Sequence, residues 1–205
     1  MKKYLAFVVA LGLAFVLTTN GLAAGINFDI SVFEDSENYT IEFDDMNDTG
    51  EITPVESVVC ASVTEDEEGL FIGLFDIKIT EDYPPVLRIN FMYMGEDWIF
   101  VDKVIIKPGD TRYTFEVNRD TDVSGGKVIE TFTVVLTDES IQMLQDIVDN
   151  RFNVRCRLDG ERDVDFNLVF SSLEGLKMLL DDYRASGALN NDFSLLKIAY
   201  PCEIK

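Results

Sequence analysis

The strongest constraint on the fold is the alternation of apolar and polar side chains between Val86 and Val117. One face of its first segment carries Leu87, Ile89, Phe91 and Tyr93, and its last segment repeats the pattern with Tyr113, Phe115 and Val117. This period of two is typical of half-buried strands. The segment Trp98–Ile106 is mostly apolar on both faces, as expected for a central strand covered on both sides. Pro108 and Gly109 form a turn sequence, so the pattern favours an antiparallel meander.

The rest of the chain is also rich in strand patterns. Strands are predicted over residues 26–32, 38–43, 55–63, 70–80, 128–136, 152–158, 164–170 and 193–200, with a polar connection at 118–126. Two helices are expected in the last third, one capped by Thr137 and one that begins at the capping box Ser171–Glu174. The sequence therefore predicts a mainly β fold, an antiparallel β-sandwich or barrel-like sheet of roughly eight to ten strands with two helices.

The N-terminal residues 1–24 have the plan of a secretory signal peptide. Lys2 and Lys3 precede the apolar segment Tyr4–Leu17, and small residues follow up to Ala23 and Ala24. The apolar segment is shorter than the roughly 20 residues that a membrane-spanning helix needs, although an uncleaved anchor is the alternative. Cleavage after Ala23 or Ala24 would leave one β-rich domain at 25–205. The expected location is secreted, extracellular or periplasmic.

The charge of the chain limits its partners. Its formal net charge is −21, and loss of the predicted signal peptide would remove two lysines and no acids. Such a surface repels phosphate groups, so nucleic acid and anionic lipid are poor partners. No segment after residue 24 is apolar and long enough to embed the protein in a membrane. We expect an extracellular or cell-surface partner of unknown identity, although solubility alone also explains the charge.

Three cysteines remain after the predicted signal peptide: Cys60, Cys156 and Cys202. An oxidising compartment allows one disulfide and leaves one thiol. Cys156 lies on the apolar face of its predicted strand, which favours a buried thiol and a Cys60–Cys202 bond. The other two pairings stay open.

The absence of histidine excludes several enzyme classes. Ser-His-Asp and Cys-His catalysis need an imidazole, and many zinc sites use one as a ligand. The sequence also lacks a Gly-rich phosphate loop or a dinucleotide-binding fingerprint. Acidic pairs are common, so a carboxylate-pair glycosidase is an alternative that composition alone does not support.

One loop has the residue types of a calcium site. Its oxygen ligands would be Asp45, Asn47, Thr49, the Glu51 carbonyl and Glu56. With Gly50 at the sharp turn and Ile52 directed inward, residues 45–56 resemble the twelve-residue loop of EF-hand and dockerin proteins. That resemblance implies Ca²⁺ as a possible cofactor. The flanking sequences favour strands and not helices, and a polar turn joining two strands is the alternative.

Arginines and aromatic residues supply two further candidates. Arg155 and Arg157 lie on the polar face of one predicted strand and could bind an anionic group, or form internal ion pairs. Trp98 could form a sugar-stacking platform with Tyr93 and Tyr113, or all three could belong to the core.

The order of these features is similar to that of exported bacterial β-rich proteins of unassigned function. The similarity rests on Trp98-Ile99-Phe100, the helix after Thr137 and the segment Arg155–Gly160. It implies export and a β-rich fold, and no catalytic residues. We therefore expect an exported, non-catalytic protein with a binding or structural role at the cell exterior. The alternatives are an extracellular hydrolase, and an assembly protein that adds a partner's strand to a sheet edge.

Overall fold

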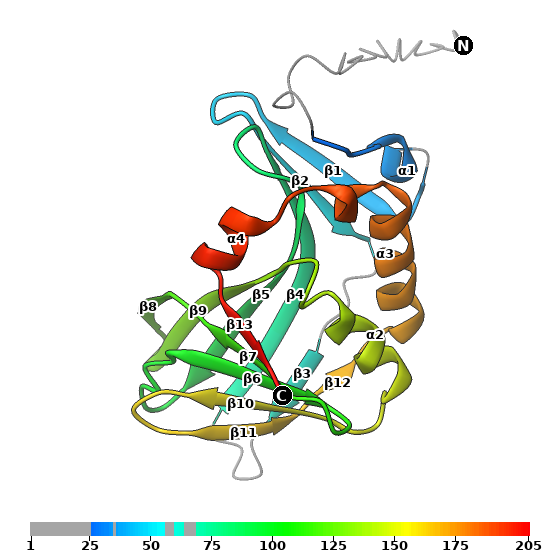
Figure 1. Ribbon diagram of the computed structural model, residues 1–205. Helices are drawn as coiled ribbons and strands as arrows, with labels where there is room; N and C mark the ends of the chain where they lie inside the picture. The colour runs from blue at the N-terminus through cyan, green and yellow to red at the C-terminus, as the bar shows by residue number, and fades with distance from the viewer. Residues whose placement is uncertain (1–25, 35, 56–59, 64–68) are drawn as a thin grey trace, which may run out of the picture.

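The computed structural model describes residues 26–34, 36–55, 60–63 and 69–205, and it consists mainly of two antiparallel sheets (Figure 1). The strands of the first sheet are β1 (Tyr39–Asp44), β2 (Thr49–Pro54), β3 (Cys60–Val63), β4 (Gly69–Thr80), β5 (Val86–Gly95), β8 (Arg119–Ser124), β9 (Lys127–Leu136) and β12 (Val169–Phe170). The strands of the second sheet are β6 (Lys103–Pro108), β7 (Tyr113–Glu116), β10 (Val154–Asp159), β11 (Val164–Asn167) and β13 (Cys202–Ile204). The predicted mainly β, sandwich-like fold is confirmed.

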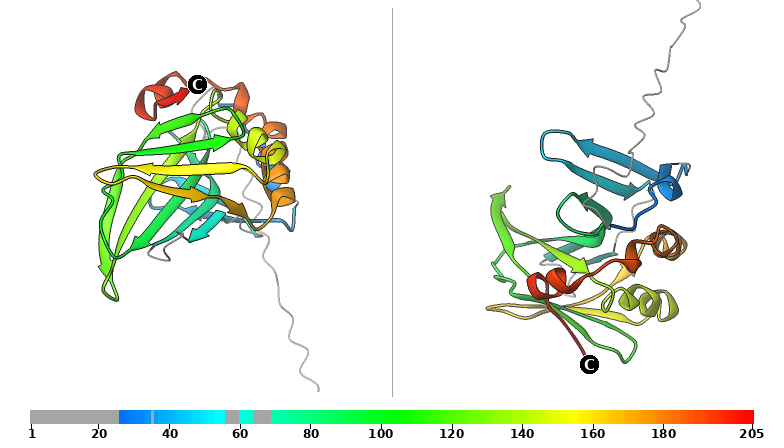
Figure 2. Two further views of the ribbon diagram at one scale, coloured as in Figure 1. Left: turned by 90° about the horizontal axis from the view of Figure 1, so that it is seen from below. Right: turned by 45° about the horizontal axis from the view of Figure 1, so that its top comes forward.

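The first sheet is built around one long hairpin, which β4 and β5 form. It runs β1-β2-β4-β5-β9-β8, and β2 and β3 share one edge of β4 by pairing with opposite ends of that strand. The second sheet runs β11-β10-β6-β7-β13. The β1–β2 hairpin extends away from the second sheet (Figures 1 and 2). β1 and β8 are thus the ends of the main strand order, and β12 ends the branch that runs through β3.

The core lies between the two sheets and contains stacked aromatic rings. Phe71 of β4 stacks on Phe91 of β5 at 4.9 Å and on Phe166 of β11 at 4.8 Å between ring centroids. Since β11 belongs to the second sheet, these contacts join the sheets face to face. Tyr93 and Tyr113 are buried, which places them in the core rather than on a platform.

Four helices lie against the two sheets in the described part of the chain. They are α1 (Ser31–Glu34), α2 (Gln142–Asp149), α3 (Leu173–Ala185) and α4 (Ser194–Ala199), with a 3₁₀ turn at Ala188–Asn190. α2 and α3 lie side by side, whereas α4 lies apart from them on the first sheet (Figures 1 and 2). The side chain of Ser172 accepts a hydrogen bond from the Gly175 N–H at 2.9 Å, so the cap of α3 is Ser172 and not Ser171. No helix in the described ranges is both long and apolar enough to cross a membrane.

The predicted central strand Trp98–Ile106 is wrong over its first half. The strand β6 begins only at Lys103, and the segment before it crosses from one sheet to the other. The reason is Glu130 of β9, whose buried carboxylate accepts hydrogen bonds from the N–H groups of Ile99, Phe100 and Val101 at 2.6, 2.9 and 2.9 Å. Backbone donors held in this way are not free to pair with a neighbouring strand.

The predicted polar connection at 118–126 is also wrong, because β8 occupies most of it. Gly125 and Gly126 both have positive φ, at 60° and 80°, which suits the two-residue turn of the β8–β9 hairpin. Every side chain of β8 after Arg119 is exposed. A strand with both faces exposed to solvent has no alternation of apolar and polar residues that a sequence pattern can detect.

Three other predictions at element ends are wrong. Most of the predicted strand at residues 193–200 is instead the helix α4, because Asp192 accepts hydrogen bonds from the N–H and hydroxyl of Ser194 and starts a helical turn. Residues 26–32 likewise form no strand, since Asp29 bonds Ser31 in the same manner at the start of α1. Thr137 does not cap α2, which begins at Gln142 after a separate hydrogen-bonded turn.

Candidate functional site

A buried ion pair lies on the face of the first sheet that is turned away from the second sheet. The guanidinium of Arg88 donates two hydrogen bonds to Asp76, from Nε to Oδ1 at 2.7 Å and from Nη2 to Oδ2 at 2.6 Å. Asp76 is 3% exposed, and the two residues are directly opposite each other on β4 and β5. Nη2 also reaches Oε2 of Glu51 at 3.4 Å. This pair is therefore a fixed polar centre in an apolar sheet.

Asn90 connects this ion pair to the next strand. Its side-chain Nδ2 donates to Oδ2 of Asp76 at 2.6 Å, and its Oδ1 accepts from the Thr133 hydroxyl at 2.9 Å. Asn90 and Thr133 are opposite each other on β5 and β9. Because both ends of the amide are bonded, its orientation is fixed without any contribution from a ligand.

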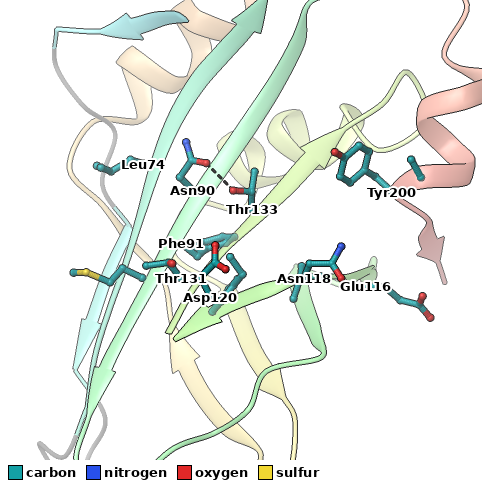
Figure 3. Close-up of a pocket in the computed structure, with 13 residues that line it drawn as sticks. Leu74, Asn90, Phe91, Glu116, Asn118, Asp120, Thr131, Thr133 and Tyr200 are labelled. Carbon is teal, nitrogen blue, oxygen red and sulfur yellow. Dashed lines mark hydrogen bonds between the residues drawn. The ribbon is translucent and has the colours of Figure 1, made fainter. Parts of the chain in front are cut away.

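Asn90 and Thr133 open onto a cleft of about 440 Å³ (Figure 3). The cleft is lined by Leu74, Asn90, Phe91, Met92, Glu116, Val117, Asn118, Asp120, Thr131, Phe132, Thr133, Ala199 and Tyr200. The sheet supplies its floor, and the connection from β7 to β8 and the end of α4 supply its walls (Figure 3). Its volume lies in the range of small-molecule sites, roughly 300–1,000 Å³.

A small apolar cluster fixes α4 on this face of the sheet. Phe193 and Leu196 of the α4 region pack on Val86 of β5 and Val135 of β9, and all four are buried. These two sheet residues alternate with the buried residues of the main core, so they point to the outer face. The cluster thereby places Tyr200, one residue after α4, at the rim of the cleft (Figure 3).

The lining of the cleft combines apolar and polar residues, and none of its residues is Lys or Arg. It offers amides, hydroxyls and the two carboxylates of Glu116 and Asp120. These groups can bind hydroxyl or ammonium donors, and they repel anions. In Figure 3 the carboxylate of Glu116 points away from Asp120, with Asn118 between the two.

The residues of the predicted calcium loop lie in the β1–β2 turn. Asp44, one residue before the predicted loop, accepts hydrogen bonds from Nδ2 of Asn47 at 2.6 Å and from the Met46 N–H at 3.0 Å, and the bond from Asn47 is the main cause of its lowered pKa. Asp45 is exposed in the turn. Thr49 belongs to β2 and pairs with Thr80 of β4.

Two other members of that loop have different surroundings. The Glu51 side chain is directed to Arg88, and Glu56 lies outside the described residues. Strands, not helices, flank the turn, as in the alternative interpretation. No group of three or more His, Cys, Asp or Glu side chains within the described ranges is arranged to hold a metal ion. Calcium binding stays a prediction.

Arg155 and Arg157 both lie on the exposed face of β10, but their surroundings differ. Arg157 donates to Asp165 from Nε at 2.7 Å and from Nη2 at 2.8 Å, and this bonding raises the pKa of Arg157 and lowers that of Asp165. Arg155 forms no ion pair within 4.0 Å to any residue in the described part of the chain. The structure therefore assigns the internal-pair alternative to Arg157 only.

Trp98 is partly buried, and its indole stacks on Phe100 at 5.6 Å between ring centroids. Of the cysteines, Cys156 is buried in β10, and Cys202 is half-buried in β13. No disulfide joins these two. The side chain of Cys60 lies outside the described part of the structure, so the predicted Cys60–Cys202 bond is not tested.

Comparisons with protein-family models, with curated proteins and with solved structures gave no match. The cleft therefore has to be interpreted from its own chemistry. Sequence analysis did not identify Asp76, Asn90 or Tyr200 as site residues. A signal existed for Asp76, because it is the only acid in the strand β4 and lies between apolar residues. Tyr200 gave none, because it was assigned to a predicted strand.

Proposed function

We propose that this protein is an exported, non-catalytic binding protein whose cleft on the first sheet takes a small, hydroxyl-rich ligand. The observation that carries this proposal is the set of polar side chains that line the cleft. Asn90 and Thr133 are held in place by hydrogen bonds, and Asp120 and Tyr200 lie around them. Amides and hydroxyls that are already oriented bind vicinal hydroxyl groups at a low entropic cost. A neutral mono- or disaccharide has the matching chemistry.

The charge of the lining supports the choice of ligand class. An anionic ligand would meet Glu116 and Asp120 with no compensating cation in the lining. A neutral sugar satisfies the carboxylates by donating hydroxyl protons. Its less polar face can pack against Leu74, which is 42% exposed at the cleft.

Calorimetric titration with cellobiose, maltose and galactose tests the ligand class. Asp120→Asn removes a charged acceptor from the cleft, and Asp122→Asn is the matched control, because Asp122 is on the same strand and outside the lining. We expect one sugar to bind with a Kd at or below about 1 mM. Its affinity should fall about tenfold in Asp120→Asn, which equals about 1.4 kcal/mol. Equal affinities in the two variants, or no binding by any sugar, would contradict the proposal.

The hydrolase alternative depends on Glu116 and Asp120, since both line the cleft. Glycosidases use two carboxyl groups that face each other across the scissile bond. In Figure 3 the carboxylate of Glu116 is directed away from Asp120, so the two do not face each other, which favours binding over catalysis. Release of nitrophenol from a panel of nitrophenyl glycosides, lost in Asp120→Asn, would favour the hydrolase instead.

The exported state depends on the N-terminal segment, which lies outside the described residues. The basic, apolar and small-residue sections of residues 1–24 support it. Intact-mass measurement of the protein expressed with its own N-terminus is the test. A mature chain that starts at Ala24 or Gly25 is expected, and a full-length chain in the membrane fraction would contradict it.

A further inference from the structure

A row of positive charge crosses the exposed face of the second sheet. Arg155 of β10 is directly opposite Lys107 of β6. Ile106 of β6 pairs with Tyr113 of β7, and both are buried. Lys107 follows Ile106 and Arg112 precedes Tyr113, so these two cations flank the turn between β6 and β7. Arg112 and Lys205 exchange two backbone hydrogen bonds, at 2.8 and 2.9 Å. These four residues (Arg155, Lys107, Arg112 and Lys205) form what we term the cationic row.

Nearby acids compensate the charge of the cationic row only in part: Glu203 acts on Lys205 and Arg112, and Asp165 acts on Arg155. Lys205 pairs with Glu203 at 2.6 Å, but Arg155, Lys107 and Arg112 form no ion pair within 4.0 Å to any described residue. Like charges that face each other across neighbouring strands are unfavourable. The chain has 38 acidic and 17 basic residues, so three neighbouring cations without an ion pair to any described residue are unexpected on solubility grounds. The position of the cationic row therefore indicates an anionic partner.

The direction of the row restricts the shape of that partner. Adjacent strands are about 4.7–4.9 Å apart, so neighbouring cations follow one another at about that spacing across the strands. An extended peptide places same-face side chains about 6.6 Å apart, which does not match the row. A flat anionic membrane would also bring the acidic remainder of the surface close to its own charge. A thin linear polyanion can contact the row alone.

An exposed aromatic ring lies close to the same end of β10. Phe152 is 89% exposed, and the guanidinium of Arg151 lies 4.6 Å from its ring centroid. The Gly109 N–H, next to Pro108 of β6, donates to the carbonyl of Asn153 at 3.1 Å, which holds this segment beside the turn that follows Lys107. Exposed aromatic rings can pack on the apolar face of a sugar. A phosphate chain without bases has no apolar face that could pack on such a ring.

We propose that the cationic row binds an acidic polysaccharide that carries one carboxylate on each sugar. The polymer runs across β10, β6, β7 and β13, and its successive carboxylates meet the four cations. Phe152 packs against a sugar at one end of the row. This site is independent of the cleft, because it lies on the other sheet and binds anions, whereas the cleft repels them.

Binding of de-esterified polygalacturonate tests this site, with neutral dextran as the control polymer. The test variant Lys107→Gln/Arg112→Gln removes two charges from the row. The matched variant Lys127→Gln/Lys177→Gln changes the net charge equally, and both of its residues lie outside the second sheet. All four residues are at least partly exposed, and thermal melting would show that both variants fold.

We expect the row variant to bind polygalacturonate at least about tenfold more weakly than the wild type, and the matched variant to bind within about twofold of it. Binding should also weaken as salt is raised, since exposed charges are screened. An equal loss of polygalacturonate binding in both variants would overturn the proposal. Binding of dextran as tightly as polygalacturonate would overturn it as well. Preference for poly-glutamate, for vesicles with anionic lipid or for a second copy of the chain in sedimentation would overturn it too.

Discussion

Asp76 and Arg88 form a two-bond ion pair across β4 and β5, and Asp76 is almost completely buried. Burial disfavours the charged guanidinium, but the hydrogen bonds and charge of Asp76 outweigh it and raise the pKa of Arg88. A second Arg–Asp pair, Arg157 with Asp165, has similar bond lengths but lies on an exposed face. The fold thus contains a natural comparison of the same interaction in two environments.

Arg88→Met should lower the free energy of unfolding by about 3 kcal/mol, because it leaves a buried carboxylate without its charged partner. Arg157→Met should cost less than about 1 kcal/mol, since exposed pairs are screened by water. Urea denaturation of both variants measures the difference. Similar losses would show that the burial of Asp76 has no energetic consequence. A double variant, Asp76→Leu with Arg88→Leu, should recover most of the loss.

Glu130 holds the segment that crosses between the sheets, because it accepts three backbone hydrogen bonds from residues 99–101. Its exchange for glutamine, Glu130→Gln, replaces one acceptor oxygen with an NH₂ group that faces a backbone donor. We expect a loss of about 2–3 kcal/mol, as for charge-assisted bonds that are broken inside a protein. The exposed residue Glu96 gives the control Glu96→Gln, with less than about 0.5 kcal/mol of change. Equal denaturation midpoints for Glu130→Gln and the wild type would contradict the assigned role of Glu130.

Gly160 limits the same crossing segment from the opposite side. A Cβ at this position would lie 2.5 Å from the carbonyl oxygens of both Ile99 and Phe100. Backbone atoms held by Glu130 cannot move aside easily, so Gly160→Ala should destabilise the protein by about 2 kcal/mol or more. Gly125→Ala is a useful comparison, because nothing lies near its Cβ and only its positive φ opposes the change, at about 1–2 kcal/mol. A harmless Gly160→Ala would mean that the crossing segment is not tightly held.

The strands that the sequence predicts well are those with one buried face. Buried residues alternate with half-buried ones in β5 and with exposed ones in most of β10, as the pattern requires, and both strands were predicted close to their bounds. Sequence patterns cannot anticipate where backbone donors find a distant partner. The segment at residues 98–102 is apolar enough for a strand, and only the carboxylate of Glu130, some thirty residues later, decides otherwise.

The candidate cleft was not predictable for a related reason. Its floor comes from β5 and β9, its walls come from the β7–β8 connection and the α4 region, and no motif joins these segments in the sequence. The cationic row was foreseen only in part. Arg155 was identified from its strand, whereas Lys107, Arg112 and Lys205 come into line with it only through the strand order of the second sheet.

Calcium provides a test of the β1–β2 turn. The sequence predicts that calcium raises the melting temperature and that EDTA reverses the rise. Binding must detach Asn47 from Asp44 and compete with the Arg88 contact of Glu51, so the rise should require millimolar ion. Asn47→Ala should abolish it, whereas Asn38→Ala, outside the turn, should not. An unchanged melting temperature at about 10 mM calcium would show that the prediction is wrong.

Cys202 should be a poor nucleophile in the folded protein. Burial is the main cause that raises the pKa of its thiol to about 12, so less than about one molecule in a thousand carries the reactive thiolate at pH 8. Iodoacetamide labelling of reduced protein, mapped by peptide mass spectrometry, should be at least about tenfold slower at Cys202 than in the unfolded chain. The rate should rise with pH up to about 12. Equal rates in folded and unfolded protein would contradict burial of this thiol, and a non-reducing map would separately show whether Cys202 pairs with Cys60.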